Sequence, residues 1–86
     1  MVADKSRQTV CANVARILRQ ERERRGISMT VLGERSGLSQ QMVSYVERDM
    51  RNPSLDTLLR MCDALGIELD DVIRRAKKPA AKRSEK

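Results

Sequence analysis

The sequence predicts an all-α fold of five helices, in which the second and third form a helix-turn-helix. Five segments place apolar residues three and four positions apart, as one face of a helix requires, and no segment has the pattern of a strand. Gly26, Gly37 and Gly66 follow three of these segments, and Ser39 and Ser54 precede two of them. The pattern therefore indicates one small helical domain.

The first helix is expected over about Val10 to Arg25, ending at Gly26. Residues 1–9 are polar and are expected to form a flexible N-terminal arm. The apolar stripe of the helix consists of Val10, Val14, Ile17 and Leu18.

One turn beyond Leu18, this stripe reaches Arg22, a charged residue on an apolar face. Glu47 is a matching case, because it lies four residues after Val43 on the side of the third helix that is expected to be buried. Since a buried charge requires a partner, we predict an Arg22–Glu47 ion pair between the first and third helices. The alternative is two solvated charges, because charged side chains are seldom buried.

Residues 28–48 contain two short helices joined by a tight turn. The first of them is expected over 30–36 and is ended by Gly37, whose missing Cβ permits the left-handed conformation of a sharp turn. Gly33 lies where the two helices must approach each other, and a large side chain there would separate them.

The third helix is expected over 40–48, with Ser39 as its N-cap. Val43 and Val46 are three residues apart and therefore share one buried side. The outer side near the N-terminal end then carries Gln40, Gln41, Ser44 and Tyr45.

A loop over 49–53 precedes the fourth helix, which is capped by Ser54 and has Asp56 in its first turn, where the helix dipole favours an anion. A fifth helix is expected over 69–75, and residues 76–86 are expected to form a disordered basic tail, so the folded domain is 10–75. The apolar stripe of the fourth helix consists of Leu55, Leu58, Leu59, Cys62 and Leu65.

The 86 residues contain 18 Lys and Arg against 12 Asp and Glu, a net charge of +6. The charge is uneven: +4 up to residue 53, −4 over 54–73 and +6 over 74–86. The basic half of the folded part contains the helix-turn-helix, which suits a polyanionic partner on that side.

Cys11 and Cys62 lie far apart, and the chain has no histidine, so neither a metal site nor a cofactor is expected. Each cysteine falls on an apolar stripe and is expected to be a packed, reduced thiol, with a redox role as the alternative. Neither a membrane-spanning run nor a signal peptide is evident, which favours a cytoplasmic protein.

Taken together, these motifs resemble the phage-repressor-like (Cro/CI, or Xre) helix-turn-helix family. The resemblance rests on Leu32-Gly33, Gly37, Val43 and Val46 at their spacing, continues through 51–55 and 62–67, and covers about residues 14–73. It implies a lambda-repressor-like, five-helix DNA-binding domain with its motif at about 29–48. It also implies the Arg22–Glu47 pair.

In this family the start of the third helix contacts bases, which makes Gln40 and Gln41 the first candidates, followed by Ser44 and Tyr45. A glutamine amide can bond adenine at N6 and N7 together, a pattern unique to adenine in the major groove. The alternative is an ordinary polar helix surface. Tyr45 could touch a thymine methyl group, bond a phosphate or cover the second helix.

The family also grips the DNA backbone with the start of the second helix and the loop after the third. Two positions depart from the family pattern. Met29 stands where many relatives have a glutamine that braces the third helix, and Asp49 stands where relatives often have glycine, although aspartate tolerates the left-handed region. The implied phosphate contacts are Thr30, Ser39, Arg48, Arg51 and Asn52.

One reading helix contacts too few base pairs to specify a site, and relatives pair two copies on a near-palindromic operator. We therefore expect a homodimer. The alternative is that the core of one small domain uses all of these apolar residues. The expected interface consists of Leu58, Leu65, Leu69, Val72 and Ile73.

The sequence thus favours a sequence-specific transcriptional regulator of double-stranded DNA, a homodimeric repressor or controller protein. The alternative is an antitoxin whose main role is to bind a partner protein. An enzyme is not expected, because the chain has no histidine, no Gly-rich phosphate loop and no nucleophile beside a base.

Overall fold

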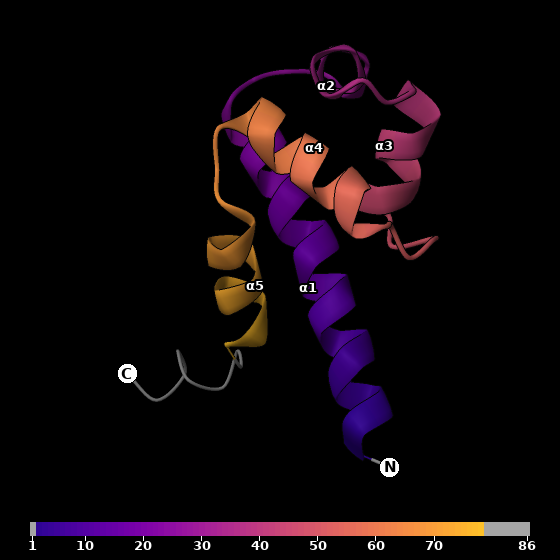
Figure 1. The fold of residues 1–86 in the computed structure, drawn as a ribbon, viewed down its shortest axis with the longest axis vertical. Helices are drawn as coiled ribbons and strands as arrows, with labels where there is room; N and C mark the ends of the chain where they lie inside the picture. The colour runs from indigo at the N-terminus through magenta and orange to yellow at the C-terminus, as the bar shows by residue number, and fades with distance from the viewer. Residues whose placement is uncertain (1, 79–86) are drawn as a thin grey trace.

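Helix α1 (Val2–Arg24) is the longest element, and the other helices are arranged along it (Figure 1). The computed structural model describes residues 2–78, which form five α-helices and no strand. This confirms the predicted all-α fold. The remaining helices are α2 (Met29–Ser36), α3 (Gln40–Glu47), α4 (Leu55–Leu65) and α5 (Leu69–Lys77).

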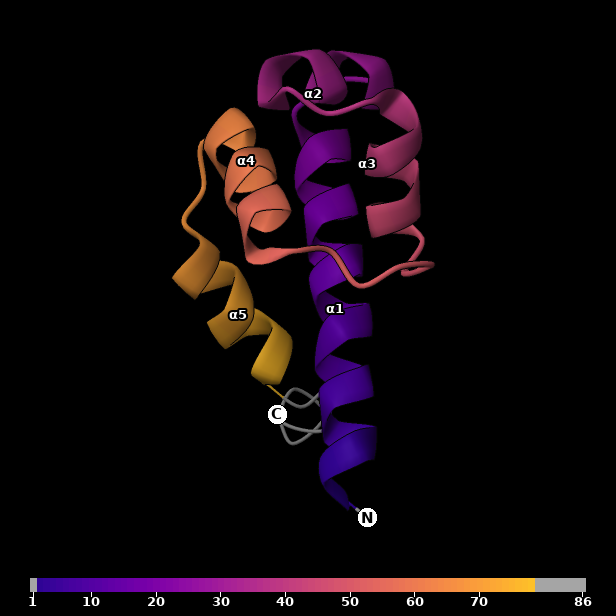
Figure 2. The same ribbon diagram turned by 45° about the vertical axis from the view of Figure 1, so that its right-hand side comes forward.

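The two ends of α1 have different surroundings. α2, α3 and α4 gather around its C-terminal half, and α5 lies along its other side, whereas its first turns project beyond them (Figures 1 and 2). All five helices contribute to a shared core, and α2 packs mainly on α3 and α4. No helix within residues 2–78 combines the length and the apolar character that crossing a membrane would require.

Helix α1 begins at Val2, so the expected start near Val10 was wrong, and the expected arm is helical over residues 2–9. No glycine or proline interrupts the chain before Gly26, and each residue added to an existing helix gains a hydrogen bond. Residues 6–9 are exposed, so polarity correctly predicted their exposure but not their conformation.

Helix α5 ends at Lys77, two residues later than expected, because Ala76 belongs to the core. The Ala76 side chain is buried, and its carbonyl accepts a hydrogen bond of 2.9 Å from Nδ2 of Asn13 on α1. The predicted tail therefore cannot include Ala76 and Lys77. Residues 79–86 of that tail lie outside the described residues.

The core is aliphatic and draws on all five helices. Leu55 and Leu59, which belong to the apolar stripe expected on α4, are 65% and 43% exposed. The side that α4 buries is rotated toward Met61, which is fully buried and lies between Leu58 and Leu65 at helical spacing. The buried cluster contains Val14, Ile17, Leu18, Leu32, Val43, Val46, Met61, Cys62, Leu65, Val72 and Ala76.

The ion pair expected between Arg22 and Glu47 is present. Nε and Nη2 of Arg22 donate to the two carboxylate oxygens of Glu47 at 2.8 and 3.0 Å. The Glu47 side chain is fully buried and that of Arg22 is 11% exposed. Nη1 of Arg22 also donates to the carbonyl of Ile27 at 2.8 Å. One guanidinium therefore joins α1, α3 and the link that leads into α2.

A second buried carboxylate, Glu21, was not anticipated from the sequence. It is 4% exposed, pairs with Arg25 directly after the end of α1, and accepts from Arg75 of α5 at 3.1 Å. The hydrogen bond from Arg25 holds the pKa of Glu21 below its usual value, burial acts against this, and Arg75 adds to it. Consecutive residues of α1 thus link it to α5 and to α3.

Replacing Glu47 with alanine should lower the free energy of unfolding by about 3–5 kcal/mol, because Arg22 would remain largely buried without its partner. Urea unfolding followed by circular dichroism measures this loss. The control is Asp56→Ala, which removes an exposed pair with Arg60 and should shift the unfolding midpoint far less, because solvent screens exposed charges. Equal unfolding midpoints for Glu47→Ala and the parent would contradict the expected loss of stability.

Candidate nucleic-acid interface

Helices α2 and α3 form a two-helix unit that closes one end of the bundle (Figure 2). Ser28 begins α2 by accepting a hydrogen bond from the Val31 amide at 3.1 Å, and Ser39 begins α3 by accepting from the Met42 amide at 3.0 Å. Between them, Gly37 ends α2 in the left-handed region, with φ of 76°. The predicted cap at Ser39 and turn at Gly37 are therefore confirmed.

Gly33 allows the turn to lie directly against α2. A Cβ atom at this position would lie 2.7 Å from the carbonyl oxygen of Leu38 and 3.3 Å from the amide nitrogen of Gln40. Both atoms belong to the backbone, which cannot simply rotate away. The predicted need for a small residue at this contact is confirmed, and it fixes the angle at which α3 leaves the turn.

Helix α3 separates its buried and outer sides sharply. Val43 and Val46 are 0% and 2% exposed and, with Glu47, attach the helix to the core. Gln40 and Gln41 are exposed, whereas Ser44 and Tyr45 are half-buried. The structure therefore brings the four predicted base-contacting residues together on one surface, and their contact with bases stays a prediction.

Three of these outer residues contact a neighbouring polar side chain on the same surface. Nε2 of Gln41 donates to the phenol oxygen of Tyr45 at 2.7 Å, and Nη1 of Arg48 donates to Oγ of Ser44 at 3.3 Å. The guanidinium carbon of Arg51 lies 4.9 Å from the centre of the Tyr45 ring, within the range of a cation–π contact. The surface thus carries two sets of contacting side chains, one of Gln41, Tyr45 and Arg51 and one of Ser44 and Arg48.

Met29 contacts the start of α3. Nε2 of Gln40 lies 4.0 Å from the sulfur of Met29, which is a weak acceptor. A thioether therefore occupies the place where many relatives have a bracing glutamine. The contact leaves the Gln40 amide exposed and held only weakly, in contrast to that of Gln41.

All five predicted phosphate-contacting residues are exposed around α2 and α3. Thr30 is in the first turn of α2, while Arg51 and Asn52 follow α3 in the loop. Asp49 has a φ of 55°, so aspartate does adopt the left-handed turn where relatives often have glycine. Helix α5, which carries Asp70 and Asp71, lies across α1 from α3 and away from this surface (Figure 1). Ser39 and Arg48 occupy the N-cap and C-cap of α3.

The expected dimer interface is only partly available. Leu65 and Val72 are 3% and 0% exposed within one chain, so including them was wrong, because the small core uses both side chains. Leu58, Leu69 and Ile73 are half-buried and retain some exposed surface. The part of the interface left for a second copy therefore consists of these three residues.

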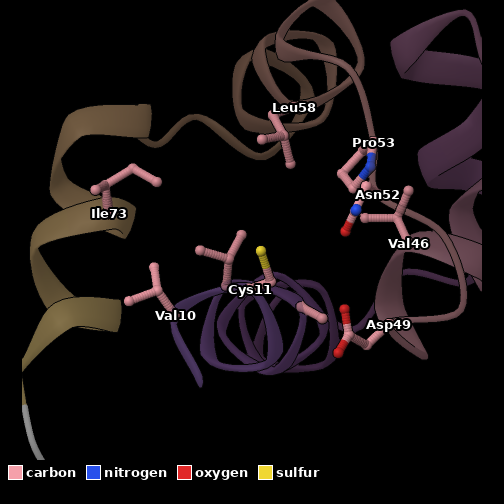
Figure 3. A pocket seen from close by; sticks show the side chains of 10 residues that line it. Val10, Cys11, Val46, Asp49, Asn52, Pro53, Leu58 and Ile73 are labelled. Atoms are coloured by element: carbon pink, nitrogen blue, oxygen red, sulfur yellow. The ribbon is translucent and has the colours of Figure 1, made fainter. Parts of the chain in front are cut away.

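Leu58 and Ile73 also border an apolar hollow of 160 Å³ between α1, α4, α5 and the loop after α3. Figure 3 shows them around the space, with Val10 and Cys11 of α1 below it. Cys11 is exposed, so its expected packing was wrong, whereas Cys62 is buried as expected. Burial is the main reason that the pKa of the Cys62 thiol rises to about 11.

A family model described as Helix-turn-helix matches residues 18–72, which is more than half of the chain. The chain therefore belongs to the helix-turn-helix family of DNA-binding transcriptional regulators, of the Xre or Cro/CI type. This confirms the family resemblance that the motif spacing indicated.

Several relatives share this region. An uncharacterized HTH-type transcriptional regulator of Mycobacterium tuberculosis is 41% identical over 59 residues, which cover 69% of this chain and 42% of the relative. One from Sinorhizobium fredii is 39% identical over 61 residues, 71% of this chain and 74% of the relative. The immunity repressor protein of Bacillus phage phi105 is 36% identical over 52 residues, which cover 60% of this chain and 36% of the relative. The chain thus spans less than half the length of the mycobacterial and phage relatives.

Replacing Gly33 with alanine should give a net loss of about 1 kcal/mol or more in unfolding free energy. The new methyl group would press on the Leu38 carbonyl, and this outweighs the better helix propensity of alanine, which is at most about 1 kcal/mol. Urea unfolding measures the change. Glu34→Ala, at the next and exposed position of α2, should stay within about 0.5 kcal/mol of the parent. A Gly33→Ala chain as stable as the parent would show that the turn can relax away from α2.

Proposed function

We propose that this protein is a sequence-specific regulator that inserts α3 into the major groove of double-stranded DNA. The observation that carries the proposal is the outer side of α3, where two exposed glutamine amides stand at the N-terminal end of a helix. A glutamine amide offers both a donor and an acceptor, which matches N7 and N6 of adenine. Gln40 and Gln41 are therefore the proposed base readers.

The surroundings of α3 support the same orientation. Thr30 and Ser39 lie at two helix N-termini, where backbone amides and hydroxyl groups favour phosphate oxygens. Arg48, Arg51 and Asn52 lie at the other end of α3. With phosphate groups held at both ends, α3 would be aligned in the groove between them.

We further propose that two copies bind a near-palindromic operator, with α4 and α5 at the dimer contact. The support is the half-buried surface of Leu58, Leu69 and Ile73, on elements other than α3. One relative is an immunity repressor, which favours repression by occlusion of the promoter. The proposed setting is the cytoplasm, and the proposed role requires neither a cofactor nor catalysis.

Selection of binding sites from random duplex DNA tests the reading surface. The parent should enrich two adenine-containing half-sites, and Gln40→Ala and Gln41→Ala should each relax one position by about 1–3 kcal/mol of discrimination. Gln20→Ala, an exposed glutamine on α1, is the matched control and should select the parent's site. An equal loss of affinity for all DNA sequences would mean that these amides contact the DNA phosphate backbone instead of bases. A parent that enriches no site would reject sequence-specific binding.

Sedimentation at micromolar concentration tests the dimer. The parent should sediment as a dimer on its operator, and Ile73→Asp should shift it to a monomer, because a charge would be buried at the contact. Gln20→Asp adds the same charge at an exposed position and should leave the dimer intact. Circular dichroism verifies that Ile73→Asp is folded. A parent that is monomeric both free and on DNA would reject the proposed assembly.

A further inference from the structure

Tyr45 is the only aromatic residue of the chain, and it lies between two side chains of the proposed DNA surface. Its phenol oxygen accepts the 2.7 Å hydrogen bond from Gln41, one turn earlier on α3. Its ring faces the guanidinium of Arg51, which belongs to the loop after α3. The two contacts use different parts of the tyrosine, the hydroxyl group and the ring face.

The contact with Gln41 leaves the amide in a form that suits adenine. A glutamine amide has two N–H donors and one carbonyl acceptor. With one N–H directed to Tyr45, the other N–H and the carbonyl oxygen remain free, and these are the two groups that adenine N7 and N6 require. The side chain is also held in place before DNA arrives, which reduces the rotational freedom that binding must remove.

The contact with Arg51 acts on the other component of binding. The loop turns back toward α3 at Asp49, whose φ is 55°, and the amide of Met50 donates to the Tyr45 carbonyl at 3.0 Å. This return brings Arg51 over the ring, where the ring quadrupole attracts the guanidinium. The cation is then held beside α3, where a groove-bound helix would have phosphates on either side.

We propose that Tyr45 is a positioning residue for DNA recognition: its hydroxyl group sets the Gln41 amide for adenine, and its ring seats Arg51 for a phosphate. This assignment rests on the proposed function. It differs from direct contact of Tyr45 with a base, because the tyrosine acts through its two neighbours. It also predicts that the hydroxyl group and the ring control separable properties, sequence discrimination and salt dependence.

The test measures binding of the full chain to its selected operator and to a duplex in which the adenine read by Gln41 is replaced by guanine. Tyr45→Phe keeps the ring and removes the hydroxyl group. It should lower discrimination at that one position about three- to tenfold, because the Gln41 amide is no longer held. The salt slope of binding and discrimination at the Gln40 position should not change.

Tyr45→Leu removes the ring as well. It should show the same loss of discrimination. In addition, the slope of log affinity against log salt concentration should fall by about one per subunit, because the ring no longer holds Arg51 near a phosphate. In the Gln41→Ala background, Tyr45→Phe should have no further effect on discrimination, since the group that it positions is absent. Circular dichroism shows whether each variant is folded, and Tyr45→Phe makes the smallest change to packing.

Three results would overturn the assignment. An equal loss of affinity for every base after Tyr45→Phe would make the hydroxyl group a phosphate contact. A loss of discrimination at a position other than that of Gln41, or a further loss in the Gln41→Ala background, would make Tyr45 a base reader itself. A parent without discrimination at any position would reject the proposed function together with this inference, whereas the first two results would leave the function standing.

Discussion

The bidentate pair between Arg22 and Glu47 is the constraint on which the position of α3 depends. α3 has only eight residues, and its apolar contact with the core consists of Val43, Val46 and the partly buried Met42. Two parallel hydrogen bonds fix direction as well as distance. A buried ion pair contributes little net stability compared with apolar residues of the same volume, but breaking it is costly. Its main effect is therefore to select one orientation of α3.

The same region of α1 also fixes α5. Neighbouring residues of a helix point in directions about 100° apart, so Glu21 reaches Arg75 of α5 while Arg22 reaches α3. In an aliphatic core without phenylalanine or tryptophan, these charged contacts supply directional restraints that methyl groups cannot. If α5 binds a second copy, α1 would link that contact to α3 in each subunit and so set how the two α3 helices are oriented to each other.

The features that depend on local chemistry were predictable from the sequence. The caps at Ser39 and Ser54, the turn at Gly37 and the mismatched charges at Arg22 and Glu47 each follow from residue type and spacing. What depends on packing between helices was not. Spacing alone could not decide which side of α4 faces the core: Leu55 and Leu59 of the expected apolar stripe are exposed, whereas Met61, which the stripe did not include, is fully buried. The burial of Glu21 could not be predicted without knowing where α5 lies, and the Arg51–Tyr45 contact could not be predicted without knowing the path of the loop after α3. The Gln41–Tyr45 hydrogen bond could have been predicted, because residues four apart on a helix are neighbours.

The contrast between the two cysteines has a practical consequence. Cys62 is enclosed and holds its proton up to a pKa of about 11, so at neutral pH it offers almost no thiolate to a reagent. Cys11 is exposed at the edge of the hollow beside Asp49 and Asn52. A maleimide dye would therefore label the unaltered chain at one place, and its emission would report on the surroundings of the loop that follows α3.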